Sequence, residues 1–183
     1  MKTYIALLRG INVSGHKIIK METLRKVLEE LDFKHVSTYI QSGNILFRSV
    51  EKSIPKLEKL IAALIDKHFG FDVPVTVVTP EELKKIVLEN PYANHTIDDP
   101  AQPYVSFLSE VPAADKLKLL QALDFKGDNF ITVGKTMYIN YVNSAGDSKL
   151  SNAIIESKLK LSSTARNWKT VNKLIELAEA IEA

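Results

Sequence analysis

The sequence predicts an α+β protein of two ferredoxin-like halves, in which helices pack on antiparallel sheets. Residues 1–90 follow the order strand, helix, strand, strand, helix, strand, which is the βαββαβ plan of that fold, and a linking helix comes next. Residues 91–103 are rich in Pro, Asn and Asp, as is typical of a linker. A similar order restarts in residues 104–183, so we expect a second α+β half that ends in a long helix.

The first expected element is a strand at residues 3–9, "TYIALLR", which is apolar on both faces and therefore suits the centre of a sheet. A helix begins near Met21, where apolar side chains recur at helical spacing. Residues 36–49 then predict two strands joined by a tight turn. Gly43 supplies the positive φ that a primed turn requires.

The first half continues with a helix that starts after Ser53 and ends at Gly70, followed by a strand at residues 73–78. The sequence "TPEE" at residues 79–82 starts the linking helix, because Thr is a good N-cap and Pro and acids suit the first turn. The second half is expected to begin with a strand at residues 104–109 and a helix at residues 112–123, followed by a hairpin at residues 129–142. Two helices then follow, at residues 148–160 and 165–182.

Composition narrows the class of protein. The 183 residues contain no cysteine, which excludes disulfides, thiolate metal sites and a Cys nucleophile and fits a reducing cytoplasm. No apolar run is long enough to span a bilayer, so we expect a cytoplasmic protein without a membrane partner. The net charge of +2 is too small to indicate a strong overall field.

Two distant segments of the first half are expected to meet. In the βαββαβ unit the end of the first strand, the start of the first helix and the turn of the hairpin lie at one edge of the sheet. This edge would gather polar and basic side chains, with no acid before Glu22. The candidate ligand-binding residues there are Arg9, Asn12, His16, Lys17, Lys20, Gln41, Ser42 and Asn44.

The charge at the helix start favours an anionic ligand. Lys17 and Lys20 lie where the helix dipole prefers acids, which costs about 0.3–1 kcal/mol per exposed charge unless an anion lies between them. The structural alternative is that Gly10 and Gly15 only turn the chain, Asn12 caps a turn and the lysines stay in water. Both interpretations stay open at the level of sequence.

A ninth candidate lies in "STARNWKTVNKL", residues 163–174. Thr164 is expected to cap the last helix, and Trp168 begins its buried stripe. Arg166 would then lie in the first helical turn near the outer face. It can bind a phosphate or carboxylate bidentately, or pair with an acid of the other half.

Enzyme motifs are scarce, and the sequence indicates no cofactor. The run from Gly10 to Gly15 lacks the Lys-Ser/Thr that a phosphate loop needs, and the four histidines have no metal-like spacing. His16 is the one histidine that we expect could act as an acid or base beside a bound phosphate. An RNA-binding sheet face would carry Tyr4 and Tyr39, but "GNILFRS" lacks the aromatic pattern of an RRM, so we place nucleic acid below a small ligand.

Four segments of the chain, "YIALLRGINVSGHKIIKM", "LRKVLEELDF", "TYIQSGNILF" and "TARNWKTVNKLIELA", resemble the signature segments of a bacterial family called domain of unknown function 1697. Ser14 departs from that pattern, which has Gly at this position in most relatives. The resemblance implies paired ferredoxin-like units and no established activity or catalytic residue. It also implies that the edge loop, the hairpin turn and the segment around Arg166 serve one purpose.

Two classes of function follow from the sequence. The first is a binder, or an enzyme, for a phosphate- or carboxylate-bearing ligand such as a nucleotide, held by the loop at residues 9–20 and the turn at residues 41–44. The second is a non-catalytic protein-interaction or nucleic-acid-binding module whose conspicuous residues are structural. We expect a monomer or a weak homodimer.

Overall fold

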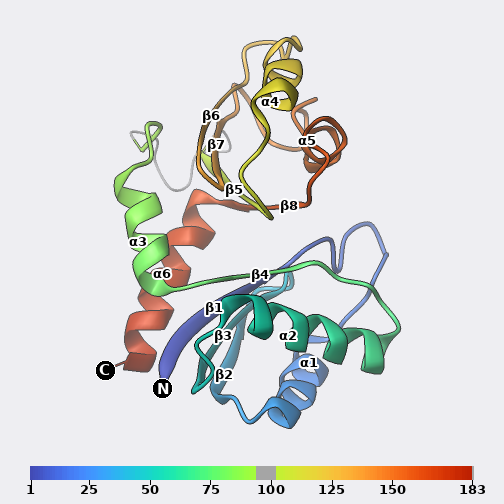
Figure 1. Ribbon diagram of the computed structural model, residues 1–183, viewed down its shortest axis with the longest axis vertical. Helices are drawn as coiled ribbons and strands as arrows, with labels where there is room; N and C mark the ends of the chain where they lie inside the picture. Colours follow the sequence, from blue (N-terminus) through green and yellow to red (C-terminus); the bar gives the residue numbers. More distant parts are fainter. Residues whose placement is uncertain (94–101, 183) are drawn as a thin grey trace. The chain divides into compact units, whose positions relative to one another are not determined.

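The computed structural model describes residues 1–93 and 102–182 (Figure 1). The chain divides into two compact units, of which the first is Met1–Lys85 with Lys173–Ala183 and the second is Ile86–Asn172. Most of the expected linker at residues 91–103 lies outside the described residues. Within the described part of the chain, no helix has the length and apolar composition needed to cross a membrane.

The first unit contains the complete βαββαβ unit that the sequence predicts. Its elements are β1 (Lys2–Leu8), α1 (Met21–Leu28) with a 3₁₀ turn η1 (Glu29–Leu31), β2 (Lys34–Tyr39), β3 (Asn44–Ser49), α2 (Ile54–Phe69) and β4 (Val75–Val78). The strands form an antiparallel sheet in the order β2-β3-β1-β4, with β1 at a central position. The helix α3 (Pro80–Leu88) follows.

The second unit repeats this topology. Its elements are β5 (Tyr104–Leu108), α4 (Ala114–Gln121), β6 (Asn129–Val133), β7 (Thr136–Asn140), α5 (Asn152–Leu159) and β8 (Ser163–Asn167), and the helix α6 (Trp168–Glu182) continues from β8. The strand order is β6-β7-β5-β8, again antiparallel throughout. Two four-stranded sheets with helices packed on them therefore give the expected α+β fold with two ferredoxin-like halves.

The strand β8 corrects one expectation. The sequence predicts Thr164 and Arg166 at the start of the last helix, but the structure places both in β8, where Phe107 pairs with Thr164 and Val105 with Arg166. The helix starts at Trp168, and its cap is Asn167, whose side-chain oxygen accepts a hydrogen bond of 2.8 Å from the Thr170 amide.

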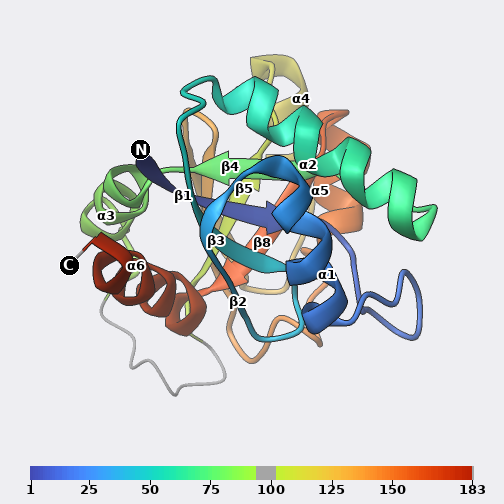
Figure 2. The same ribbon diagram turned by 90° about the horizontal axis from the view of Figure 1, so that it is seen from below.

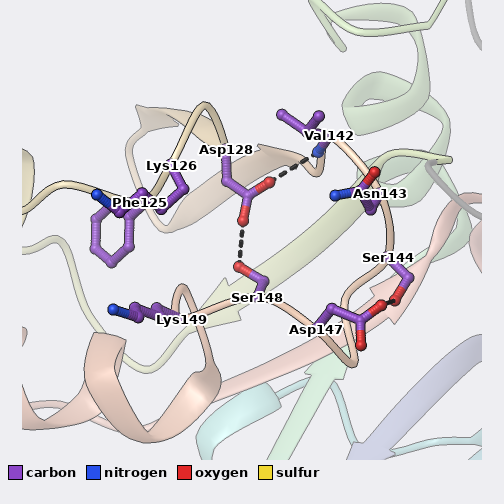
Figure 3. A pocket seen from close by; sticks show the side chains of 9 residues that line it. All are labelled: Phe125, Lys126, Asp128, Val142, Asn143, Ser144, Asp147, Ser148 and Lys149. Carbon is purple, nitrogen blue, oxygen red and sulfur yellow. Dashed lines mark hydrogen bonds between the residues drawn. The ribbon is translucent and has the colours of Figure 1, made fainter.

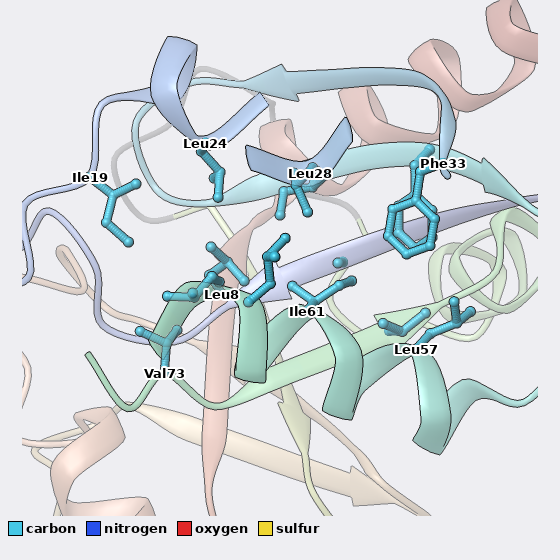
Figure 4. Close-up of a cluster of buried hydrophobic side chains, with 14 of the residues drawn as sticks. Leu8, Ile19, Leu24, Leu28, Phe33, Leu57, Ile61 and Val73 are labelled. Carbon is cyan, nitrogen blue, oxygen red and sulfur yellow. The ribbon is translucent and has the colours of Figure 1, made fainter. Parts of the chain in front are cut away.

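The core of the first unit lies between its helices and one face of the sheet. Figure 4 shows Leu24 of α1, Ile61 of α2 and Leu8 of β1 in this cluster of buried side chains, and Figure 2 shows both helices on the same face of the sheet. Tyr4 also belongs to the core, with its ring centroid 5.7 Å from that of Phe47. Tyr4 therefore does not lie on an open sheet face, as the less favoured RNA-binding alternative would require.

Candidate functional site

The end of β1 and the turn between β2 and β3 lie together at one edge of the first sheet. The Leu8 amide donates a hydrogen bond of 2.8 Å to the Gly43 carbonyl, and Leu7 pairs with Asn44 in the antiparallel ladder. The side chain of Asn12 reaches across and donates to the Gln41 carbonyl at 2.8 Å. The loop and the turn that the topology predicts to be neighbours are thus directly bonded.

Asn12 holds this arrangement rather than offering its amide to solvent. Its side-chain nitrogen donates to the carbonyls of Ile19 and Gln41, and its side-chain oxygen accepts from the Ile19 amide at 2.9 Å. Both amide hydrogens and the oxygen are therefore used inside the protein. Asn12 also adopts φ +53, a conformation that asparagine tolerates better than most residues.

Residues 12–17 form a small hairpin that projects from the loop. The Asn12 amide donates to the Lys17 carbonyl at 3.2 Å, and Val13 forms an isolated antiparallel bridge with His16. Ser14 and Gly15 at its tip have φ +49 and φ +78, the positive values that a type I′ turn needs at both central positions. Glycine adopts such a conformation without strain, which gives a physical reason for the glycine expected in place of Ser14.

The β2–β3 turn is fixed by Gly43 and Asn44. Gly43 has φ +77, and a Cβ atom there would lie 2.7 Å from the Leu8 Cβ and 2.8 Å from the Ile11 Cδ1. Asn44 is fully buried and donates to the Tyr39 carbonyl and the Ser42 hydroxyl, both at 3.0 Å. The polar groups of Ser42 and Asn44 therefore brace the turn.

The remaining candidates include the lysine and arginine side chains of this edge. Lys20 is exposed at the N-cap of α1 and makes no capping hydrogen bond with its side chain, so no side chain of the N-cap residue satisfies the first-turn amides. His16 is exposed on the small hairpin, and the side chain of Gln41 is exposed on the turn. Arg9 is partly buried directly after β1.

A third segment joins the edge, and the sequence reasoning missed it. The Arg9 amide donates to the Pro74 carbonyl at 3.0 Å, and the Lys17 ammonium donates to the Asp72 carbonyl. Because β4 runs antiparallel to β1, the loop before β4 must lie beside the end of β1, and this topological signal was available from the sequence. We call residues 9–20, 41–44 and 70–74 the corner.

Acids at the corner are few. Asp72 is exposed and contributes its backbone carbonyl to Lys17. Glu22, the first acid of α1, forms an ion pair of 2.9 Å with Lys26, and the hydrogen bond from Lys26 is the main cause that lowers the pKa of its carboxyl group. Glu22 is thus engaged one turn further along the helix.

Arg166 has a different environment from the other candidates. It belongs to the second unit and is buried, with a relative exposure of 7%. Its Nη1 donates to the Thr164 hydroxyl at 3.0 Å and to the Ala165 carbonyl at 2.8 Å. Arg166 is therefore buried and bonded within β8, whereas the sequence predicts a solvent-exposed position for it.

The second unit contains a small pocket beside its β7–α5 loop (Figure 3). Its volume is about 120 Å³, below the roughly 300–1,000 Å³ of most small-molecule sites. The two oxygens of Asp128 accept from the Val142 amide at 2.7 Å and from the Ser148 hydroxyl, so this carboxylate ties the two sides of the pocket together. In the described part of the chain, no group of three acids or histidines could hold a metal ion.

The repeated βαββαβ topology and the braced corner define a two-unit ferredoxin-like protein with a basic edge on its first unit. The chain belongs to the family described as protein of unknown function (DUF1697), whose model matches residues 1–138.

Two similar proteins illustrate the range of relatives. A probable phosphoglycerate kinase of Caenorhabditis elegans is 25% identical over 170 residues, which cover 89% of this chain and 38% of that protein. The chain thus spans well under half of that relative's length. The structure of a conserved bacterial protein from Streptococcus pneumoniae matches with a TM-score of 0.71 and 25% identity, covering 96% of this chain and 98% of that one.

Proposed function

We propose that the corner binds a small anionic ligand that carries a phosphate or carboxylate group. The observation that carries this proposal is the direct bonding of the loop at residues 9–20 to the turn at residues 41–44, which holds basic side chains beside the N-terminus of α1. Helix N-termini and nearby cations together favour bound anions.

The candidate residues have two roles in this proposal. Asn12, Ser42 and Asn44 hold the loops in position, because their side chains bond within the protein. The ligand contacts come from the basic groups, the exposed amide of the turn and the first amides of α1. These contact residues are Arg9, His16, Lys17, Lys20 and Gln41, of which Lys17 also holds the loop through its bond to the Asp72 carbonyl.

The name of the Caenorhabditis elegans relative, a probable phosphoglycerate kinase, specifies a phosphate-bearing substrate for that protein. It supports the choice of phosphate compounds as first probes here. Phosphoryl transfer is not part of the proposal, since the run from Gly10 to Gly15 lacks the Lys-Ser/Thr of a phosphate loop.

A thermal-shift screen with sulfate, inorganic phosphate, pyrophosphate, ADP and citrate tests the proposal. An anion at a hundred times its Kd stabilises the native state by about 2.7 kcal/mol, which raises Tm by roughly 5–10 °C for a chain of this size. Lys20→Ala should reduce the shift, because it removes an exposed charge at the N-cap of α1 without removing a packed side chain.

The matched control is Lys59→Ala, which removes the same charge from the exposed side of α2. This variant should respond to the anion as the wild-type protein does. Equal loss of the response in both variants would show non-specific charge screening. No shift with any anion in the wild-type protein would refute the proposal.

A second candidate function is a protein or nucleic-acid contact through the same corner. It is favoured by two apolar side chains of the projecting loop, Val13 and Ile18, which are 57% and 56% exposed. Exposed apolar side chains beside basic residues suit a macromolecular partner better than a phosphate ion. A single-stranded RNA added to the screen distinguishes the two, because a shift with RNA and none with small anions supports only this candidate.

A further inference from the structure

In the described residues, three of the four sheet edges carry a feature that opposes pairing with another strand. In β2, Lys34 is exposed and a bulge interrupts the register. In β4, the Val77 amide donates to the carboxylate of Glu58 on α2 at 2.9 Å. In β8, the Ser163 amide donates to the carboxylate of Glu156 on α5, also at 2.9 Å.

The fourth edge, β6, carries none of these features in the described structure. Its sequence "NFITV" has no charge and no proline, and its register with β7 is continuous. Figure 1 shows β6 beside β7. Ile131 and Val133 on one face of this strand are 43% and 52% exposed. An uncharged, regular edge strand with exposed apolar side chains is the type that pairs with a further strand.

The hairpin turn fixes which backbone groups of β6 point outward. Gly134 and Lys135 form a two-residue turn, so the flanking residues Val133 and Thr136 form a hydrogen-bonded pair. Such pairs alternate along the ladder, which directs the backbone groups of Ile131 toward β7. The amides and carbonyls of Phe130 and Thr132 therefore face away from the sheet, and no residue in the described ranges bonds to them.

We propose that two copies of the chain associate through β6, antiparallel, with Ile131 on the two-fold axis. In this register Phe130 of each copy lies opposite Thr132 of the other. Each of these two pairs exchanges two backbone hydrogen bonds, so all four outward groups of each strand are satisfied. The two Ile131 side chains meet on one face, and the second sheets of the two copies join into a continuous eight-stranded sheet.

The strand is self-complementary in this register, which is why a second copy is the occupant. An isologous interface requires that one patch bind itself, and a two-fold axis at Ile131 places the outward groups of residue 130 in one copy opposite those of residue 132 in the other. The contact is one strand wide, so we expect a weak dimer. It does not depend on the proposed anion site, which lies in the first unit.

Sedimentation equilibrium of the full chain up to millimolar concentration tests this interface. The wild-type protein should show a reversible monomer–dimer equilibrium. Ile131→Lys and Ile131→Glu should each be monomeric, because like charges meet on the axis, and an equimolar mixture of the two should regain the dimer. The control Val111→Lys, at an exposed loop position of the same unit, should dimerise like the wild-type protein.

A second variant tests the backbone bonds. Thr132→Pro removes an outward amide and leaves the β6–β7 bonds intact, so it should fold, as circular dichroism can verify, and remain monomeric. A wild-type protein that stays monomeric would overturn the proposal. So would a dimer that survives Ile131→Lys, or a mixture of the two charged variants that remains monomeric.

Discussion

At Gly43 the chain needs both a positive φ and the absence of a side chain. The backbone has φ +77, and an added Cβ would lie 2.7 Å from the Leu8 Cβ. Gly43→Ala should therefore lower the free energy of unfolding by about 2–5 kcal/mol, because backbone strain and overpacking act together. Urea unfolding monitored by circular dichroism measures the loss.

Gly10→Ala is the control for this change. Gly10 has a similar φ of +69, but no atom lies within 4 Å of the place that an added Cβ would occupy. Gly10→Ala introduces backbone strain without overpacking, so we expect the free energy of unfolding to fall by about 1 kcal/mol. Equal losses in the two variants would show that the close approach of Gly43 to Leu8 has no energetic consequence.

The sequence identified the polar residues of the corner but not their individual roles. It places Asn12 and Asn44 among the candidate ligand-binding residues and leaves a turn cap open for Asn12. In the structure their amides bond to backbone carbonyls of Gln41, Ile19 and Tyr39. Residue type shows that a donor is present. Its partner depends on which backbone carbonyls the tertiary structure brings within reach, and a single sequence does not contain that information.

Two helices begin after similar N-cap residues, Thr79 and Ser53, but we expect these two side chains to contribute different amounts to the free energy of unfolding. Thr79 forms a reciprocal capping box, in which its hydroxyl accepts from the Glu82 amide at 3.2 Å and the Glu82 carboxylate accepts from the Thr79 amide at 2.8 Å. Ser53 is also an N-cap residue, but its side chain makes no capping hydrogen bond. Thr79→Ala should therefore cost about 1 kcal/mol of stability.

Ser53→Ala provides the matched comparison for Thr79→Ala, and its cost should be within about 0.5 kcal/mol of zero. Chemical denaturation of the two variants under identical conditions measures both values. A larger loss for Ser53→Ala than for Thr79→Ala would contradict the capping geometry.

The strand β8 was missed because its composition hides its burial. Ser163, Thr164 and Arg166 are all buried, so the strand lacks the apolar alternation by which buried strands are recognised. The predicted last helix, which contains the apolar stripe from Trp168, begins at residue 165. This start is three residues before the observed start of α6 at Trp168. The hairpins and most of the helices, with clear periodicity and turn residues, were predicted at nearly their observed positions.

The duplication is visible in packing as well as in topology. The helix that precedes the last strand of each unit carries a glutamate, Glu58 in α2 and Glu156 in α5, and each carboxylate accepts the amide of that strand. The sequence predicted two halves from the order of elements alone. The equivalence of the two glutamates depends on side-chain geometry and could not be inferred from their positions in the sequence.

The stability of the whole chain should fall in alkaline solution. Burial is the main cause that raises the pKa of the Tyr141 phenol, with Tyr104 and Asp128 adding to the rise, and its hydroxyl donates to the Leu150 carbonyl at 3.2 Å. The phenol of the unfolded chain ionises at about pH 10. The contribution of the Tyr141 phenol to the free energy of unfolding is therefore complete below that pH. It is lost as the pH rises further, because only the unfolded state releases the proton.

Urea midpoints measured from about pH 8 to pH 11 test this dependence. Tyr141→Phe should be less stable at the lower pH, since it loses the bond to Leu150, but its midpoint should fall less steeply as the pH rises. Parallel curves for the wild-type protein and the variant would show that Tyr141 does not contribute to the alkaline loss.

The central claim is that the corner of the first unit binds an anion. Two-dimensional nitrogen–proton correlation spectra, recorded while pyrophosphate is added, test this claim residue by residue. We predict saturable shifts concentrated in the amides of residues 9–20 and 41–44, and weaker shifts in Lys20→Ala. Spectra that do not change, or shifts concentrated around the pocket beside Asp128, would contradict it.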